Sequence, residues 1–241
     1  MRRVVSVFLI ICFFSLSLSQ LVTAQNSATA FDRALFYFTI GRWDSVTSEL
    51  NNALKEQPNE PEIFLFIGAF LSALGDETQA TTFLAKAEKA APRTGVLVLQ
   101  GDIYRRMKNT KKAEEYYKKA LKTNPKTVMA HIGIGNIEEI NKRYNEALSA
   151  YLKALEINPE RVETLIDAGR MELLLNEAES AMTHFAKAVE IDSGSAENHL
   201  WYAKALYKSG LIDKALQQIE RTIELDPSNN EAQELKQKWQ I

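Results

Sequence analysis

The side chains of this chain that could hold a metal ion or transfer a proton are few and scattered. Its three histidines, His131, His184 and His199, lie in separate stretches, and none has a second ligand three or four residues away. A zinc site on a helix requires such a spacing, as in the pattern His-Glu-x-x-His. We therefore expect no metal, and surface positions for the three histidines.

The sequence also lacks the residue patterns that are typical of catalytic or cofactor-binding sites. Glu138 and Glu139 are neighbours in sequence, and neighbours on a helix point about 100° apart, so they cannot share a substrate. Gly133 and Gly135 bracket one residue but lie within a helical stretch, whereas a phosphate-binding loop follows a strand. No Gly-x-Ser-x-Gly nucleophile turn is present. We expect no catalytic residues, no cofactor and no enzymatic activity.

Charge is the third chemical feature, and it is unevenly distributed. The chain has a formal net charge of −2, which disfavours nucleic acid as a partner. One stretch is strongly basic, with only Glu114 and Glu115 opposing a run of cations: Arg105, Arg106, Lys108, Lys111, Lys112, Lys118, Lys119, Lys122 and Lys126. Two interpretations stay open, a solvated helix face and a site for an anionic partner, either an acidic protein or an anionic lipid.

The elements that must position these residues follow a repeating pattern. Five prolines keep a spacing of 33 or 34 residues, with Ser193 at the one place where proline is missing: Pro58, Pro92, Pro125, Pro159 and Pro227. Twenty-four residues before each place lies a small residue: Ala34, Gly68, Gly101, Gly135, Gly169 and Ala203. Eight residues before each place lies a bulky one: Leu50, Leu84, Tyr117, Tyr151, Phe185 and Ile219.

This pattern predicts two amphipathic helices of about 14 residues in each repeat, joined by a short turn such as that at Gly41, Gly75 or Gly210. Small residues let the paired helices approach closely, and the bulky residue fills the space beside them. Proline ends the second helix. At Ser193 we expect Gly194 to make the turn instead. With only 10 glycines and 6 prolines in 241 residues, the sequence predicts an all-α fold.

The 34-residue period with these constraints resembles the tetratricopeptide repeat family over about residues 27 to 227. The resemblance implies a right-handed α-solenoid of antiparallel helix pairs. It divides the chain into six repeats, at about 27–60, 61–93, 94–127, 128–161, 162–195 and 196–229. Residues 228–241 then form a capping helix, with Ala232, Leu235 and Trp239 on its apolar face.

In this family the first helix of each repeat lines a groove that binds peptides. Carried over by position, the resemblance nominates an apolar set at the N-terminal end: Phe31, Leu35, Phe38 and Leu65. It nominates a mostly charged set beyond: Asp102, Arg105, Arg106, Asn136, Glu139, Arg170, Lys204, Tyr207 and Lys208. For Phe31 and Phe38 an alternative stays open, in which neighbouring helices or a second subunit bury them.

The first residues indicate export. Arg2 and Arg3 precede a run of apolar residues, and Ala24 ends a stretch typical of a secretory signal cleaved after residue 24. An uncleaved anchor over residues 4–23 is the alternative, because about 20 apolar residues cross a bilayer as a helix. A lipoprotein signal ending at Cys12 fits poorly, since Ile11 stands where a small residue is required. Cleavage would leave no cysteine, as in many periplasmic proteins.

Together these features predict a non-enzymatic exported scaffold, periplasmic or envelope-bound, that binds a protein or peptide partner in its groove. The alternative is a structural assembly factor or self-associating part of an envelope machine of the pilus- or secretion-assembly type. A homo-oligomer is compatible with either. Membrane contact is expected only through residues 4–23, if they are not removed.

Overall fold

A computed structural model describes residues 29–239, which form thirteen α-helices and no strand. Contacts divide them into two compact units, of which unit 1 ends at Tyr116 and unit 2 begins at Tyr117. Unit 1 contains α3 (Ala30–Thr39), α4 (Trp43–Glu56), α5 (Pro61–Leu74), α6 (Glu77–Ala90) and α7 (Thr94–Arg106), and α8 (Thr110–Thr123) crosses the boundary. Unit 2 continues with α9 (Val128–Ile140), α10 (Tyr144–Ile157), α11 (Val162–Leu174), α12 (Ala178–Ile191), α13 (Ala196–Lys208), α14 (Ile212–Leu225) and α15 (Asn230–Trp239).

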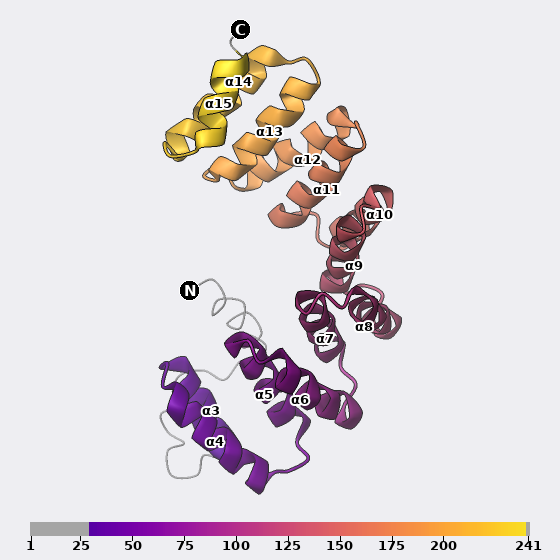
Figure 1. Cartoon of the computed structure of the whole chain (residues 1–241), viewed down its shortest axis with the longest axis vertical. Coiled ribbons are helices and arrows are strands. Elements are labelled where there is room, and N and C mark those ends of the chain that lie inside the picture. Colours follow the sequence, from indigo (N-terminus) through magenta and orange to yellow (C-terminus); the bar gives the residue numbers. More distant parts are fainter. Residues whose placement is uncertain (1–28, 240–241) are drawn as a thin grey trace. The chain divides into compact units, whose positions relative to one another are not determined.

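Helices adjacent in sequence pack as antiparallel pairs within each unit (Figure 1). The all-α prediction and the helix pairs are therefore confirmed. The division into six repeats stays a prediction, and the signal or anchor at residues 1–24 lies outside the described residues. Within residues 29–239, no helix is both long enough and apolar enough to cross a membrane.

Close approach of a glycine to a bulky side chain holds the pairs together, as the pattern predicts. A Cβ atom built on Gly68 would lie 2.6 Å from Leu84, one on Gly135 would lie 2.5 Å from Tyr151, and one on Gly169 would lie 2.7 Å from Phe185. Real Cβ atoms do not come this close to other heavy atoms. The glycines are required because the partner side chain already occupies the space.

Each turn inside a pair contains one residue with a positive φ, and these residues follow the same 33- or 34-residue spacing: Gly41, Gly75, Lys108, Lys142, Asn176 and Gly210. Only glycine adopts this conformation without a steric cost. The three glycines were predicted to form turns, whereas Lys108, Lys142 and Asn176 were not recognised as their equivalents.

The turns between pairs in unit 2 depend on a side-chain oxygen. Asn158, Asp192 and Asp226 each accept a hydrogen bond from the backbone N–H two residues on, at 3.4, 3.2 and 3.1 Å. The explanation given above for Ser193 is wrong, because Gly194 has no positive φ. The Asp192 carboxylate makes this turn, and proline is dispensable there.

The apolar face expected at the C-terminus is buried in unit 2. Ala232 and Trp239 belong to a cluster with Leu200, Leu206 and Ile219, and Leu235 packs against it. The helix α15 thereby covers the apolar end of the α13–α14 pair.

Candidate peptide-binding site

The nominated residues Asn136 and Glu139 meet around the hydroxyl of Tyr151. This hydroxyl lies 2.8 Å from Asn136 Oδ1 and 3.1 Å from Glu139 Oε2, so α10 is hydrogen-bonded to α9. The ring itself is fully buried against Gly135. The residue that fills the space between the helices therefore also fixes two polar side chains on the first helix of its pair.

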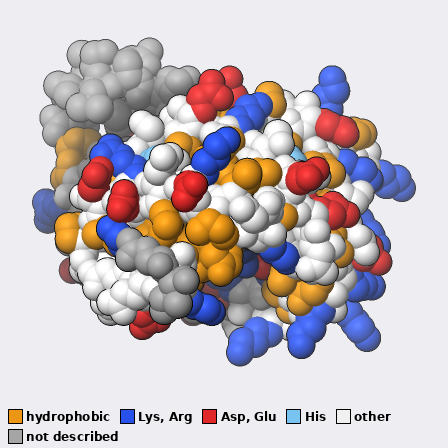
Figure 2. Space-filling model, turned by 90° about the horizontal axis from the view of Figure 1, so that it is seen from above, with side chains coloured by type: hydrophobic (Ala, Val, Ile, Leu, Met, Phe, Trp, Pro, Cys, Tyr) orange, Lys and Arg blue, Asp and Glu red, His pale blue; other side chains and the backbone are white. Residues whose placement is uncertain are grey.

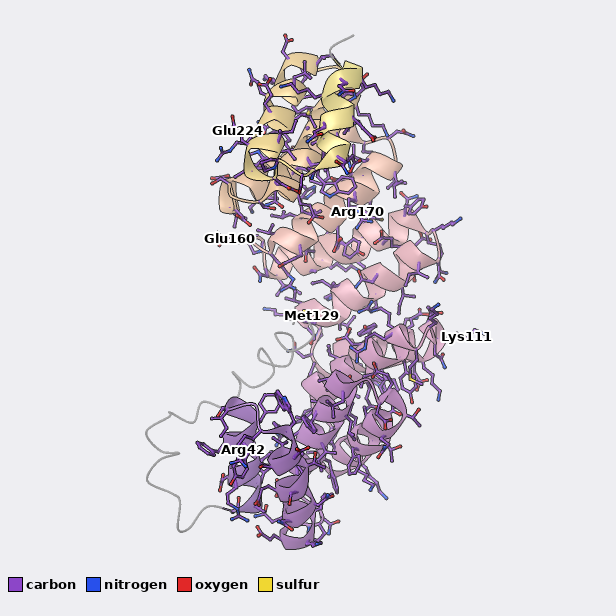
Figure 3. All side chains as sticks on the ribbon, turned by 60° about the vertical axis from the view of Figure 1, so that its left-hand side comes forward. Arg42, Lys111, Met129, Glu160, Arg170 and Glu224 are labelled. Atoms are coloured by element: carbon purple, nitrogen blue, oxygen red, sulfur yellow. The ribbon has the colours of Figure 1, made fainter. Side chains whose placement is uncertain are left out.

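Arg170 extends this group to α11. Its Nη2 atom lies 2.7 Å from Glu139 Oε1, and its Nη1 atom lies 3.2 Å from Asp167 Oδ1. Figure 3 shows Arg170 on α11 among side chains of neighbouring helices. About a third of the Arg170 side chain is exposed, and a quarter each of Glu139 and Asp167. The ion pairs can consequently be reached by a partner molecule.

Burial changes the acidity of two groups in this network. It raises the pKa of Asp167 to about 6, with Glu139 adding to the rise and Arg170 opposing it. Burial is also the main reason that the pKa of Tyr151 is raised, with the charges of Asp167 and Glu139 contributing. Tyr151 thus stays protonated and donates its hydrogen bond, while Asp167 changes charge near pH 6.

Trp201 of α13 lies next to these charges. The guanidinium carbon of Arg170 is 5.6 Å from the centre of its ring, and Lys204 Nζ is 4.1 Å from it. The Trp201 ring also stacks on Phe185 at 6.0 Å. Cations over an aromatic face are attracted by its electron density, so Trp201 helps to hold both side chains. We define the network as Asn136, Glu139, Tyr151, Asp167, Arg170, Trp201 and Lys204.

The nominated residues nearest the C-terminus are engaged by other helices of unit 2. Lys204 forms an ion pair with Glu231 of α15 at 2.8 Å, and Tyr207 stacks on Trp239 at 4.2 Å. Lys208 donates to the backbone oxygen of Leu173 at 2.6 Å. Of these three, Lys204 alone also belongs to the network.

The apolar set in unit 1 lies in an aromatic cluster. Phe38 packs edge-on against Phe66 at 5.5 Å and Phe70 at 6.2 Å, and only 6% of it is exposed. The alternative of burial by neighbouring helices therefore holds for Phe38, which is no free anchor for a peptide. Phe31 and Leu35 pack against the same cluster but are half-buried, and half-buried Leu65 packs against the cluster around Leu84.

The charged candidates in unit 1 are tied to near neighbours. Arg105 approaches Asp102 at 3.8 Å along α7, and Arg106 pairs with Glu77 at the start of α6 at 2.7 Å. Arg106 also donates to Ser72 Oγ of α5. The Arg106 contacts connect α7 to the α5–α6 pair, whereas the Arg105 contact stays within α7. The contact of Arg170 with Glu139 also connects neighbouring pairs, and together with Asp167 it combines opposite charges around one accessible point.

All three histidines differ from the exposed surface positions expected for them, and His131 is half-buried with its Nε2 atom 2.9 Å from the backbone oxygen of Pro125. His199 is buried and lies 2.7 Å from Gln218 Oε1 and 3.1 Å from the backbone oxygen of Ser193. His184 is half-buried and contacts the buried Glu172 at 2.8 Å. His184 and His199 are structural, and residues 29–239 contain no group of three or more His, Cys, Asp or Glu side chains arranged to hold a metal.

On the face seen in Figure 2, cations and carboxylates lie interspersed, with hydrophobic side chains between them.

Sequence reasoning missed three members of the network. Asp167 lies three residues before Arg170, a spacing that places both on one helix face and was a usable signal. Tyr151 was assigned to packing alone, and Trp201 carries no signal in a single sequence.

Comparisons with known proteins give the family. Two models described as tetratricopeptide repeat match residues 98–162 and 173–238. None of the curated proteins gives a significant match to the sequence.

Solved structures of similar fold include YrrB, described as a TPR protein with an unusual peptide-binding site. It is 20% identical, with a TM-score of 0.65 over 78% of this chain and 97% of that chain. Pseudomonas aeruginosa pilF is 22% identical, with a TM-score of 0.63 over 71% and 79%. MamA is 20% identical, with a TM-score of 0.62 over 71% and 94%. At these identities the likeness concerns the fold, and together with the matching repeats it establishes that the chain belongs to the tetratricopeptide repeat family.

Proposed function

We propose that this protein is a non-enzymatic, exported scaffold of a bacterial cell envelope that binds a segment of another protein along α9, α11 and α13. Tetratricopeptide repeat proteins bind protein or peptide partners, which supports the general assignment. The observation that carries the specific site is Arg170, which bridges Glu139 and Asp167 beside Trp201 on the first helices of successive pairs.

The network suits a peptide for two physical reasons. Tyr151 and Trp201 fix the charged groups before a partner arrives, so little side-chain entropy is lost on binding. A partly exposed arginine between two carboxylates offers hydrogen-bond donors and acceptors together, and such charges give selectivity more than affinity. An extended or helical segment can use both.

The test is recovery of partners from an envelope extract by the intact protein and by the double variant Glu139→Gln/Arg170→Gln. This variant removes one charge of each sign and leaves the net charge unchanged. We expect at least one partner to be lost. The matched control is Arg221→Gln/Glu224→Gln, which removes an exposed ion pair of 2.9 Å from α14; Glu224 is labelled in Figure 3. Equal recovery with both variants would remove the network from the binding site.

Export is supported by the basic and apolar pattern of the first 24 residues. Mass spectrometry of the protein purified from its host should find a chain that begins at Gln25. A chain that retains residues 4–23 in the membrane fraction would favour the anchor. Light scattering over a wide concentration range addresses the alternative role, because a monomer at every concentration would exclude self-assembly.

A further inference from the structure

The described residues of unit 1 expose their large hydrophobic side chains in one kind of place only. Within the described part of unit 1 they number five, and all lie at or within one helical turn of the turns inside helix pairs: Phe36, Ile40, Trp43, Leu74 and Met107. Ile40 is 51% exposed, Trp43 is 42% exposed and Leu74 is 64% exposed. The turns between pairs, around Pro58 and Pro92, expose none. Within residues 29–116, the exposed large hydrophobic side chains are thus restricted to one edge.

Contacts between successive pairs show that these turns are neighbours. Trp43 stacks on Phe70 at 6.2 Å, and Phe70 lies one helical turn before Leu74 on α5. Arg106, next to Met107, donates to Ser72 Oγ near the end of the same helix. We call this surface the turn edge and define it by Ile40, Trp43, Leu74 and Met107, together with the cations Arg42 and Lys108.

The cations of the turn edge are available to an anionic partner. Arg42, labelled in Figure 3, is exposed and lies over the ring of Tyr37 at 5.4 Å, and exposed Lys108 directly follows Met107. Within residues 29–239 neither one forms an ion pair. Of the nearby carboxylates, Asp76 accepts from the backbone N–H of Gln79, Glu77 is paired with Arg106, and exposed Asp44 lies in the first turn of α4.

We propose that the turn edge docks on the interfacial region of a membrane that contains anionic lipids. Tryptophan is enriched at this depth of a bilayer, where its ring contacts both acyl chains and headgroups. Single apolar side chains that project from separate turns can insert between lipids, whereas a protein partner usually requires a packed central cluster. Arg42 and Lys108 complement the negative headgroups. This proposal is independent of the peptide site in unit 2.

The experiment measures binding to phosphatidylcholine vesicles with and without phosphatidylserine. It uses the chain from Gln25, which lacks the apolar N-terminal run but keeps every described residue; circular dichroism checks that its helices are retained. We expect binding only with phosphatidylserine, and weakening by salt. Lipids with brominated acyl chains should quench part of the tryptophan fluorescence of the unsubstituted protein, and the Trp43→Phe variant should lack this quenching.

Two double variants assign the binding to residues. Arg42→Gln/Lys108→Asn should weaken it on the order of fivefold for each cation removed; asparagine suits position 108 because Asn176 occupies the equivalent turn. Ile40→Gln/Leu74→Gln should weaken it about tenfold. The matched control, Lys55→Gln/Lys89→Gln, removes two exposed lysines from the last turns of α4 and α6 and should bind normally.

Three results would overturn the proposal. The first is equal binding to vesicles with and without phosphatidylserine. The second is equal weakening by the control variant. The third is that the protein does not bind vesicles but retains a protein partner that is lost in both Arg42→Gln/Lys108→Asn and Ile40→Gln/Leu74→Gln. This result would assign the turn edge to protein recognition.

Discussion

A methyl group added at Gly135 should destabilise α9 and α10 and disturb the network at the same time. The Cβ of Gly135→Ala would lie 2.5, 2.7 and 2.9 Å from three ring carbons of Tyr151, so the ring must move. Because the hydroxyl of this ring holds Asn136 and Glu139, its hydrogen bonds move with it.

The expected magnitude combines three effects. Overpacking in a close-packed core costs about 1–3 kcal/mol. Loss of the hydroxyl's hydrogen bonds adds about 1 kcal/mol. Alanine recovers about 1 kcal/mol because it favours helix over glycine. The net loss of local stability should therefore be about 1–3 kcal/mol, measured as the opening free energy of α9 and α10 by hydrogen exchange.

Two comparisons separate steric from hydrogen-bond effects. Gly169→Ala meets the Phe185 ring at 2.7 Å but breaks no hydroxyl contact, so only the steric loss is expected. In a Tyr151→Phe background, Gly135→Ala should cost about 1 kcal/mol less than in the wild type, since the hydrogen bonds are already absent. If the two changes are additive within about 0.5 kcal/mol, displacement of the ring does not disturb the network, and the reasoning fails.

Three further predictions concern pH, turns and the C-terminal helix. The pKa of Asp167 in the folded protein is raised to about 6, so its charged form opposes folding. As the pH rises from 4 to 7, the free energy of unfolding of the wild type, measured with urea, should therefore fall relative to that of Asp167→Asn by on the order of 2–3 kcal/mol. An unchanged difference between the two proteins across this range would contradict it. Gly210→Ala, at φ 78° with no atom near the new methyl, should cost about 1–2 kcal/mol of stability. Gly95→Ala, equally open, without a positive φ and in the first turn of α7, should not destabilise the protein in the same assay. Trp239→Ala should abolish slow hydrogen exchange in α15 without changing α9 and α10, because the lost contact with Tyr207 lies only at that end.

The helix pairs were predictable because packing repeats in the sequence. Gly68, Gly135 and Gly169 each face the bulky residue that the spacing assigns to them, so a single chain supplied several independent observations of one contact. The positive φ at Lys108 and Lys142 was not predictable in the same way. Lysine normally avoids this conformation, and only the position shared with Gly41, Gly75 and Gly210 shows that the turn requires it.

The candidate site was predictable only in part. Asn136, Glu139 and Arg170 follow from their positions in the repeat, but their partners depend on the reach of individual side chains across helices. Tyr151 fits the packing pattern as well as phenylalanine would, so the 34-residue pattern does not indicate that its hydroxyl forms hydrogen bonds. His199 was misassigned because a histidine on a helix reveals no burial until the neighbouring helix is placed.

The helix α9 is confined by tyrosines on two sides, which limits how the array could be rebuilt. A Cβ on Gly133 would lie 2.3 Å from the ring of Tyr117, just as one on Gly135 would meet Tyr151. Other first helices carry larger residues at the place of Gly133, such as Phe66, Leu99 and Trp201. A different helix pair grafted after α8 would collide with Tyr117. The helix pairs of this chain share one architecture but are not interchangeable, because each of these glycines leaves room for a particular ring: Gly133 for Tyr117 and Gly135 for Tyr151.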